Sequence, residues 1–371
     1  MNSSLSVAIY LYEPSDGGLD RVAILLANYL VGQGVRAELW MARVDGPLAS
    51  MIDPGVLIRK VATASTVRGV AMLTQLPVLR AMLRRHRPDI LFSAGNQSNL
   101  LVACAALGTR TRAVGRISNP IVRPGTRGLF AWLRRKRFQL TAWLSCRTIV
   151  MGGADADLLA GNCGAIRRKV ALLPRPTVTP VLSQTGERRV PSPPGARREL
   201  LAVGRLAPQK DHRTMLAALA LLNGHDWRLR VAGQGPLLAT LQQQCRDLGI
   251  ADRVEFLGFV GDPARLAELY GSSELLLQSS RWEGLTATAI EALACGCQLV
   301  ITDCTPNLRE IVADAGQHAM VPVGDVAAFA AAVDWTLSRP ADTDRARQAV
   351  RAYAVDEALA AHHRMFAQLK D

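Results

Sequence analysis

Short apolar runs alternate with amphipathic stretches along most of this chain, and the alternation limits the possible folds more than any other feature. The runs at 7–12, 36–42 and 89–93 look like buried strands, while 19–30 and 100–107 have the apolar spacing of helices. Further strands are predicted at 112–117, 148–151 and 170–173, and a further helix at 76–85. Regular alternation of this kind predicts parallel sheets with helices on both faces, so the expected fold class is α/β.

Length and one change in composition divide the chain. A sequence of 371 residues is long enough for two domains that each bury a core. The segment 183–198 interrupts the alternation, because it combines three prolines with glycine and basic residues and has few apolar ones. We therefore expect a linker at 183–198 between domains at 1–182 and 199–340, followed by a helical tail at 341–371.

Charge is distributed unevenly between the two halves. Residues 1–190 carry 26 Lys+Arg and 10 Asp+Glu, a net charge of +16, whereas 191–371 carry 18 and 21, a net charge of −3. A strongly basic half indicates an acidic partner, which leaves open nucleic acid, an anionic membrane face and a phosphorylated acceptor. Seven scattered cysteines and an N-terminus without a basic leader predict a cytoplasmic protein, and no apolar run is long enough to span a bilayer.

Two carboxylates eight residues apart mark the most informative short segment, Glu283-Gly-Leu-Thr-Ala-Thr-Ala-Ile-Glu291. Glu283 lies in a turn behind an apolar run, and Glu291 lies one turn into an apolar helix. This arrangement places a carboxylate and a helix N-terminus at the carboxyl end of a strand, where open α/β sheets bind phosphorylated ligands. A structural alternative is that Thr288-Ala-Ile-Glu291 forms a capping box, with Glu291 favouring the helix dipole.

Three earlier loops, each after a predicted strand, support the first interpretation. Gly204-Arg205 and Lys210 lie between the strand at 200–203 and a helix at 212–222, so a guanidinium and an ammonium are available to phosphate oxygens. Gly233-Gln-Gly235-Pro236 follows another strand, and glycine permits close backbone approach. The third loop is Leu257-Gly258-Phe259-Val260. Together with the carboxylate segment, these loops indicate a phosphate-binding edge.

These motifs resemble those of the family 4 retaining glycosyltransferases. The matching residues are Gly204-Arg205-x4-Lys210-Asp211, Gly233-x-Gly235-Pro236, Leu257-Gly258-Phe259, Glu283-x7-Glu291 with Ala292-Leu-Ala-x-Gly296, Val300-Ile-Thr-Asp303, Glu310-Ile311, Val321-Pro-Val-Gly-Asp325 and Gly17-Gly18-x2-Arg21. The resemblance is specific from about Leu200 to Asp325 and loose between Val35 and Pro174. It implies the GT-B architecture: two facing Rossmann-like domains, an N-terminal one for the acceptor and a C-terminal one for the nucleotide sugar, with a final helix crossing back to the first.

The resemblance also implies roles for the motif residues. Arg205 and Lys210 would neutralise the leaving diphosphate, and Glu283 would face the sugar or its phosphate; these three are the catalytic candidates. Glu291 would accept hydrogen bonds from the ribose hydroxyls. The remaining donor-binding candidates are Gly17, Gly18, Gly204, Gly233, Phe259, Val260, Gly284, Leu285 and Thr286. The donor would be a UDP- or GDP-sugar and no cofactor is expected. No Asp-x-Asp motif was found near a strand end, in agreement with metal-independent chemistry.

The chain departs from the family pattern at the sugar. Many relatives have an N-domain His near it, whereas this chain has Ala94-Gly-Asn-Gln-Ser and Arg116-Ile-Ser-Asn119 in that region. Asn96, Arg116 and Asn119 are therefore the candidates for sugar or acceptor contacts. Gln298 stands where a Pro is common, and Thr286-Ala287 follows Glu-Gly-Leu. These departures leave the transferred hexose open.

One basic amphipathic stretch, 128–144, interleaves Phe130, Leu133, Phe138 and Trp143 with four consecutive basic residues, 134–137. Aromatic and basic side chains on one helix suit a membrane interface, although an ordinary packing helix with a solvated basic face fits equally. With the basic first half, the stretch favours a glycan or lipid-linked acceptor in cell-surface polysaccharide or glycolipid synthesis, and a peripheral position on the inner face of a membrane.

Two other functions compete with glycosyl transfer. A nucleotide-sugar epimerase would use the same fold, whereas a phosphorylase would need a pyridoxal-binding Lys site for which no pattern is present. A basic nucleic-acid-binding protein is allowed by the charge, but aromatic residues make up only 5% of the chain and no RNA or DNA motif is recognised. The oligomeric state is left open.

Overall fold

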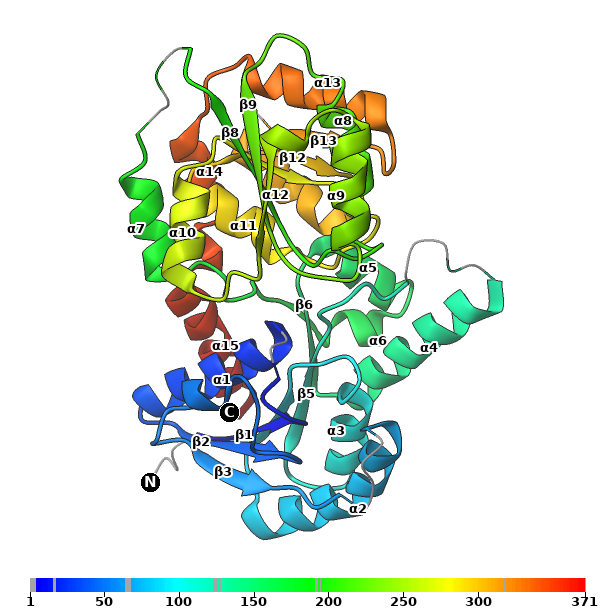
Figure 1. Cartoon of the computed structure of the whole chain (residues 1–371). Helices are drawn as coiled ribbons and strands as arrows, with labels where there is room; N and C mark the ends of the chain where they lie inside the picture. The colour runs from blue at the N-terminus through cyan, green and yellow to red at the C-terminus, as the bar shows by residue number, and fades with distance from the viewer. Residues whose placement is uncertain are drawn as a thin grey trace. The chain divides into compact units, whose positions relative to one another are not determined.

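The computed structural model describes residues 5–15, 18–63, 68–122, 126, 128–190, 193, 195–316 and 318–370. The chain forms two compact units (Figure 1). Unit 1 comprises Met1–Pro176 together with Asp356–Asp371, and unit 2 comprises Thr177–Val355. Each unit is a parallel sheet with helices around it, as the alternation of the sequence predicts.

Unit 1 contains a seven-stranded sheet in the order β3-β2-β1-β4-β5-β6-β7, with every described pairing parallel. Its strands are β1 Ser6–Leu11, β2 Arg36–Met41, β3 Leu57–Lys60, β4 Ile90–Ser93, β5 Arg112–Arg116, β6 Arg147–Val150 and β7 Val170–Leu172. Its helices are α1 Gly18–Gly32, α2 Arg68–His86, α3 Asn99–Ala106, α4 Gly128–Leu144, α5 Gly153–Ala160 and α6 Gly164–Arg167. The strand order reverses between β1 and β4, which makes that pair the switch point of the sheet.

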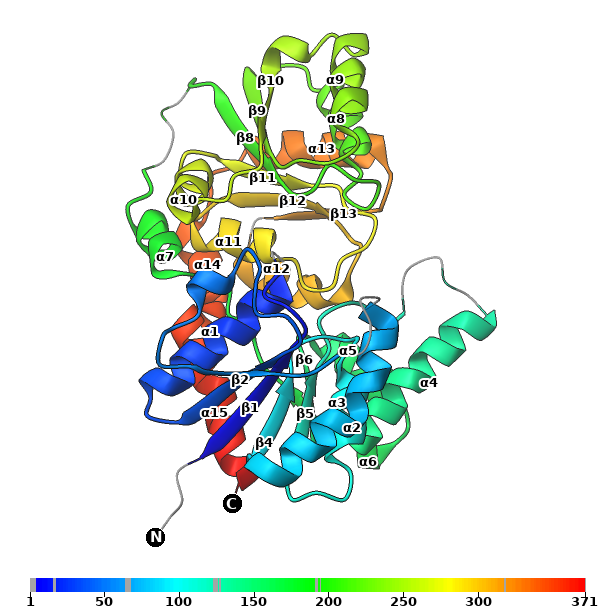
Figure 2. The same ribbon diagram turned by 60° about the horizontal axis from the view of Figure 1, so that its bottom comes forward.

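The last helix of the chain, α15 (Val355–Lys370), completes unit 1 (Figures 1 and 2). Its Phe366 is fully buried, with its ring centroid 5.6 Å from that of Phe92 on β4. The backbone carbonyl of Lys370 accepts a hydrogen bond from Arg112 at 2.9 Å. Sequence-distant residues therefore share one core.

Unit 2 contains a six-stranded parallel sheet in the order β10-β9-β8-β11-β12-β13. Its strands are β8 Arg198–Val203, β9 Trp227–Ala232, β10 Val254–Gly258, β11 Leu275–Gln278, β12 Gln298–Thr302 and β13 Ala319–Val321. Its helices are α7 Pro180–Glu187, α8 His212–Leu219, α9 Leu238–Asp247, α10 Pro263–Gly271, α11 Ala287–Ala294, α12 Arg309–Ala315, α13 Val326–Leu337 and α14 Thr343–Ala349 (Figure 2). Here the order reverses between β8 and β11.

The boundaries between the units differ from those expected of the sequence. The segment 183–198 was predicted as a linker, but unit 2 already begins at Thr177 and 183–187 is the second half of α7. Arg189 fastens the segment to unit 2, because its guanidinium donates to the carbonyls of Tyr270, Ser273 and Cys295. The tail at 341–371, predicted as one helical segment, divides into α14 in unit 2 and α15 in unit 1.

No helix in the described part of the chain is long and apolar enough to cross a bilayer.

Candidate functional site

The switch point of unit 2 brings two of the predicted loops together. Strands β8 and β11 are neighbours in the sheet, with Leu200 opposite Leu275 and Leu201 opposite Leu276. Both strands are parallel, so the loop from β8 to α8 and the loop from β11 to α11 leave the same edge. In open α/β sheets this crevice is where ligands bind.

Glycines let the loops at this edge approach one another. Gly204 has a φ of 154°, and a Cβ there would lie 3.1 Å from Cε of Lys210. A Cβ at Gly233 would overlap the carbonyl oxygen of Gly204, and one at Gly235 would overlap that of Leu206. The loop after β9 therefore lies directly on the loop after β8, and only glycine fits at the contact.

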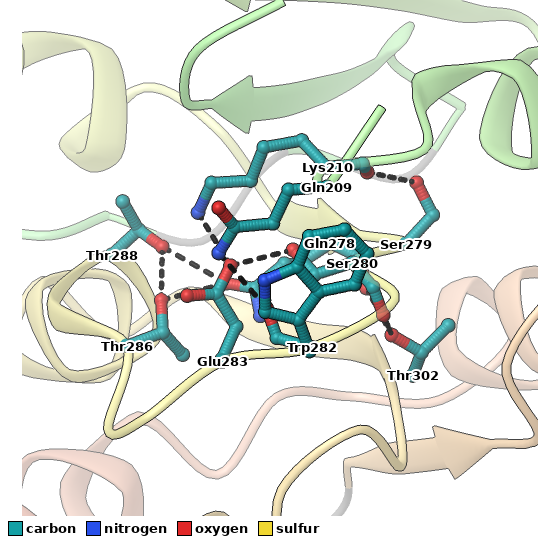
Figure 3. Close-up of polar contacts among 10 residues, drawn as sticks. All are labelled: Gln209, Lys210, Gln278, Ser279, Ser280, Trp282, Glu283, Thr286, Thr288 and Thr302. Carbon is teal, nitrogen blue, oxygen red and sulfur yellow. Dashed lines mark hydrogen bonds and ion pairs between the residues drawn. The ribbon is translucent and has the colours of Figure 1, made fainter. Parts of the chain in front are cut away.

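An ion pair joins the β8 and β11 loops (Figure 3). Nζ of Lys210 lies 2.7 Å from Oε1 of Glu283, and their side chains are 19% and 11% exposed. The same oxygen accepts a hydrogen bond from the Ser280 hydroxyl at 2.8 Å. Gln209 adds a second link, because its Nε2 donates to the carbonyl of Trp282 at 2.9 Å. The cation and the carboxylate predicted to act on the donor are thus in direct contact.

A layer of hydroxyl groups fixes the backbone behind this pair. The Ser279 hydroxyl donates to the carbonyl of Lys210 at 3.1 Å, and the Thr302 hydroxyl donates to that of Ser280 at 2.5 Å (Figure 3). The Thr305 hydroxyl donates to the carbonyl of Gly284 at 2.7 Å. Each bond fixes the backbone of one residue in the two loops. The positions of Lys210 and Glu283 are therefore supported by this hydrogen-bonded layer.

The capping-box interpretation of Thr288 and Glu291 is wrong. Helix α11 begins at Ala287 with Thr286 as its N-cap, and no side-chain cap hydrogen bond is present. Thr288 lies inside the helix and, like Thr286, donates from its hydroxyl to Oε1 of Gln278, at 3.0 and 2.9 Å (Figure 3). Gln278 lies at the end of β11 and accepts hydrogen bonds from both hydroxyls. Neither hydroxyl therefore caps the backbone N–H groups of α11.

Glu291 is held by a different partner from Glu283. Its Oε2 accepts a hydrogen bond at 2.8 Å from the hydroxyl of Tyr270 on α10, a fully buried residue. Burial, and next the charge of Glu291, raise the pKa of Tyr270 well above its ordinary value. The phenol therefore stays a hydrogen-bond donor and orients the carboxylate.

The other predicted residues of unit 2 surround this centre. Arg205 is exposed and forms no side-chain hydrogen bond or ion pair with any residue that the structure describes. Leu285 is buried, Gly284 and Val260 are half-buried, and Phe259 is 68% exposed. Arg205 and Phe259 are therefore both accessible to a ligand.

Buried His212 lies at the start of α8, next to these loops. Burial, and next the charge of Lys210, lower the pKa of its imidazole to about 4. The ring is therefore neutral at physiological pH and adds no cation to the site.

In unit 1 the predicted residues are less closely connected. Gly17 lies outside the described residues, and Gly18 is the first residue of α1. A Cβ at Gly18 would overlap the guanidinium of Arg175, so this end of α1 lies against a cation.

A hollow of about 270 Å³ lies at the switch point of unit 1. Asn96 and Asn119 both line it, and they are bonded together: Nδ2 of Asn96 donates to the carbonyl of Asn119 at 3.3 Å, and its Oδ1 accepts from the N–H of Ser118 at 2.9 Å. Ser15 and Asp20 are also on the wall and are hydrogen-bonded to each other. The hollow thus offers hydroxyl, amide and carboxylate groups.

Arg116 does not line this hollow. Its side chain is buried, Nη2 lies 3.5 Å from Sδ of Met151, and Nε and Nη1 have no hydrogen-bond partner among the described residues. Burial, and next the charge of Arg175, lower the pKa of Arg116 to about 9. The structure therefore separates Arg116 from the two asparagines with which it was grouped.

The sequence reasoning missed one Asp-x-Asp sequence near a strand end. Asp155-Ala-Asp157 lies in α5, which begins three residues after β6 ends. Asp155 is buried and Asp157 is exposed and paired with Arg167, so the two carboxylates do not converge. Within the described ranges no three His, Cys, Asp or Glu side chains form a group that could hold a metal ion.

Sequence reasoning also missed Gln209, Gln278 and Ser280, which connect the loops of unit 2. The available signal was the run Gln278-Ser-Ser280, because three polar residues directly follow three leucines of β11. Polar side chains at the carboxyl end of a buried strand are candidates for a site in this type of sheet.

Comparisons with known proteins agree with this geometry. The family model described as Glycosyltransferase Family 4 matches residues 16–179, and that described as Glycosyl transferases group 1 matches residues 183–354. A GDP-mannose-dependent alpha-(1-6)-phosphatidylinositol dimannoside mannosyltransferase of Mycobacterium tuberculosis is 35% identical over 32% of this chain and 30% of its own length. A 2-deoxystreptamine glucosyltransferase of Streptomyces kanamyceticus is 28% identical over 67% of this chain and 63% of its own length.

Among solved structures, Anabaena HepE in complex with UDP superimposes with a TM-score of 0.76 at 16% identity, covering 98% of this chain and 100% of that one. This likeness shows the fold, and the two family models together account for both units. The expected architecture is therefore confirmed: the chain belongs to the family 4 glycosyltransferases and has their GT-B fold.

Proposed function

We propose that this enzyme transfers a hexose from a UDP- or GDP-sugar to a glycan or lipid-linked acceptor, with retention of the anomeric configuration and without a metal. The observation that carries the proposal is the contact between Lys210 and Glu283 at the switch point of unit 2. The choice of donor is supported by the GDP-mannose dependence of the mycobacterial relative and by the UDP bound to the Anabaena protein.

The cations act on the leaving diphosphate. As the glycosidic bond breaks, negative charge accumulates on the phosphate oxygens, and donors already in place stabilise it best. Lys210 is fixed by its pairing with Glu283, whereas Arg205 is exposed and can fold its planar guanidinium onto the phosphates. The contact between Gly204 and Gly233 holds the two loops together beside Lys210.

The two carboxylates act on different parts of the donor. Oε1 of Glu283 is bonded to Lys210 and Ser280, while Oε2 accepts no hydrogen bond from the described residues and can receive one from a sugar hydroxyl. Glu291 is oriented by Tyr270 and binds the ribose hydroxyls, since a carboxylate accepts two hydrogen bonds at once. Phe259 or Val260 covers the base.

The acceptor binds in the hollow of unit 1. Its amide, hydroxyl and carboxylate groups can hold a hydroxyl-rich molecule in a fixed orientation. Asn96 and Asn119 form one hydrogen-bonded wall and contribute sugar or acceptor contacts. No residue is assigned as a covalent nucleophile, because in the front-face mechanism the leaving phosphate itself takes the acceptor proton.

The decisive experiment incubates the purified enzyme with UDP-, GDP- and ADP-hexoses and detects the released nucleoside diphosphate. Release with one nucleotide class, unaffected by EDTA, is expected, and NMR of a transferred product should show the donor's anomeric configuration. Inversion of the free nucleotide sugar without an acceptor would instead identify an epimerase. Absence of turnover with every donor, together with no nucleotide binding by calorimetry, would overturn the proposal.

A further inference from the structure

Helix α4 exposes large apolar side chains to solvent. Phe130 is 78% exposed, Trp143 is 58% and Trp132 is 54% exposed, and Leu129, Leu133 and Leu140 are exposed as well. Figures 1 and 2 show the first part of α4 extending beyond α3, α5 and α6, the helices on which it packs. Single exposed apolar residues are ordinary on protein surfaces, but six on one helix of 17 residues form a patch.

Five of these six exposed apolar residues share one face of the helix, and Phe130 lies to one side of it. Spacings of three, four and seven residues place side chains on the same side of an α-helix. That rule aligns Leu129, Trp132, Leu133, Lys136, Leu140 and Trp143, which we call the outer stripe. The buried residues Phe138 and Ala142 lie on the opposite side. Helix α4 therefore has an inner apolar face for packing and a second, outer one.

The charge on α4 divides into two kinds of residue. Arg134 is structural, because its guanidinium donates to the carbonyls of Ile121 and Pro120 at 2.7 and 3.0 Å. Lys136 and Arg137 are exposed, and Nζ of Lys136 lies 5.8 Å from the centroid of the Trp132 ring. No Asp or Glu occurs between 128 and 144. The surface around the outer stripe is therefore cationic.

We propose that the outer stripe of α4 docks on a bilayer that contains anionic phospholipids. The interfacial region of a bilayer accepts tryptophan rings and leucine side chains, while its phosphates attract the neighbouring Lys136 and Arg137. A second copy of the same face would instead bring these like charges together in an apolar contact. The inference concerns unit 1 alone and does not rest on sugar transfer.

Sedimentation of the full chain with lipid vesicles tests the proposal. The protein should pellet with phosphatidylglycerol vesicles, not with phosphatidylcholine vesicles, and should be released by about 0.5 M salt, because salt screens surface charge. K136Q/R137Q should lower the partition coefficient about 25-fold, since each basic side chain at an anionic surface contributes roughly fivefold. W132S/W143S should lower it at least about tenfold, through loss of interfacial anchors.

Matched variants test whether vesicle binding depends on the outer stripe itself. The alternative is that any exposed basic or aromatic side chain of the protein contributes equally. R84Q/R85Q removes two exposed arginines from α2 of the same unit, and W335S removes an exposed tryptophan from unit 2. Both should pellet like the wild type. Equal losses with R84Q/R85Q and K136Q/R137Q, or undiminished pelleting of a folded W132S/W143S, would overturn the proposal. So would self-association in sedimentation velocity that W132S/W143S abolishes, which would assign the stripe to a second copy.

Discussion

The two switch points of this protein are built differently. In unit 2 the loops after β8 and β11 are connected by an ion pair and by several hydrogen bonds, and glycines let a third loop lie directly on the first. In unit 1 the equivalent edge is an open hollow, where hydrogen bonds of Asn96 link the loop after β4 to the loop after β5. The edge of unit 2 is therefore preorganised, whereas the edge of unit 1 encloses open volume.

The difference fits the two tasks that we propose. A site that stabilises charge in a transition state works best when its donors are already in place, because no reorganisation is then needed during the reaction. A site that accepts a sugar-bearing acceptor needs volume and several hydrogen-bonding groups. The predictions below test this contrast, from the largest expected effect to the smallest.

Removal of a cation from the preorganised edge should have the largest effect. Lys210→Ala or Arg205→Ala should lower kcat at least about 100-fold, because each removes a donor to the leaving diphosphate. Steady-state release of nucleoside diphosphate measures the effect. Arg213→Ala is the control, since Arg213 is exposed on α8 of the same unit. A fully active Arg205→Ala enzyme would refute its assignment.

The two glutamates should separate binding from chemistry. Glu291→Gln should weaken the binding of UDP or GDP about tenfold or more, because charge-assisted hydrogen bonds to the ribose are lost. Glu283→Gln should mainly lower kcat, since its carboxylate contacts Lys210. Calorimetry with the free nucleotide distinguishes them. Wild-type affinity in Glu291→Gln would show that the ribose contact is wrong.

A methyl group between the touching loops should distort the preorganised edge. Gly233→Ala would push against the carbonyl of Gly204 and should lower the free energy of unfolding by about 1–3 kcal/mol, as overpacking generally does. Denaturant titration of the full chain measures it. Gly32→Ala is the control, because a Cβ there meets nothing within 4 Å. Equal stability of the two variants would mean that the loops are not in tight contact.

Acid should destabilise both units through buried histidines. His212 in unit 2 and His362 in unit 1 have their pKa lowered to about 4, in each case mainly by burial. The unfolded chain takes up these protons first as the pH falls from about 6.5, so stability declines between about 6.5 and 4. Each group removes on the order of 1–2 kcal/mol at pH 5.

Replacing one histidine should therefore flatten the acid response of its own unit. Hydrogen exchange in β8 should depend less on pH in His212→Gln than in the wild type, while exchange in β1 should be unchanged; His362→Gln should show the reverse. An unchanged pH dependence of β8 in His212→Gln would assign the acid sensitivity of unit 2 to other groups.

The smallest effect is expected in the open hollow. Asn96→Ala should raise the KM for the acceptor several-fold while leaving nucleotide affinity unchanged, because neighbouring polar groups on the wall remain. Gln33→Ala, at an exposed position after α1, is the control. A change in nucleotide affinity in Asn96→Ala would contradict the assignment of this hollow to the acceptor.

The sequence predicts the elements of the fold better than it predicts the contacts between them. Strand–helix alternation predicts both sheets, and the loops of Arg205 and Glu283 are expected at strand ends because parallel strands bring their carboxyl ends to one edge. Strand β3 was missed, because Leu57 and Ile58 are both exposed and the strand lacks apolar alternation. Local sequence patterns are sufficient to predict a helix or strand where that element buries one continuous face.

Polar contacts between residues far apart in the sequence could not be predicted. Thr288 and Glu291 fit a capping box, yet their partners are Gln278 and Tyr270, which lie on other elements. The segment expected as a linker overlaps α7, and its Arg189 donates to carbonyls at distant helix ends. Such partners are chosen by tertiary packing, which spacing along the chain does not encode.

The discontinuity of unit 1 has a consequence for the chain during its synthesis. The first 176 residues leave the ribosome long before α15, yet the space beside Phe92 is filled by Phe366 of that last helix. At typical elongation rates the delay is roughly 10–40 seconds, and unit 2 is made in full during that time. The unit whose synthesis starts first is thus the last to be completed, because its core lacks Phe366 until α15 has been made.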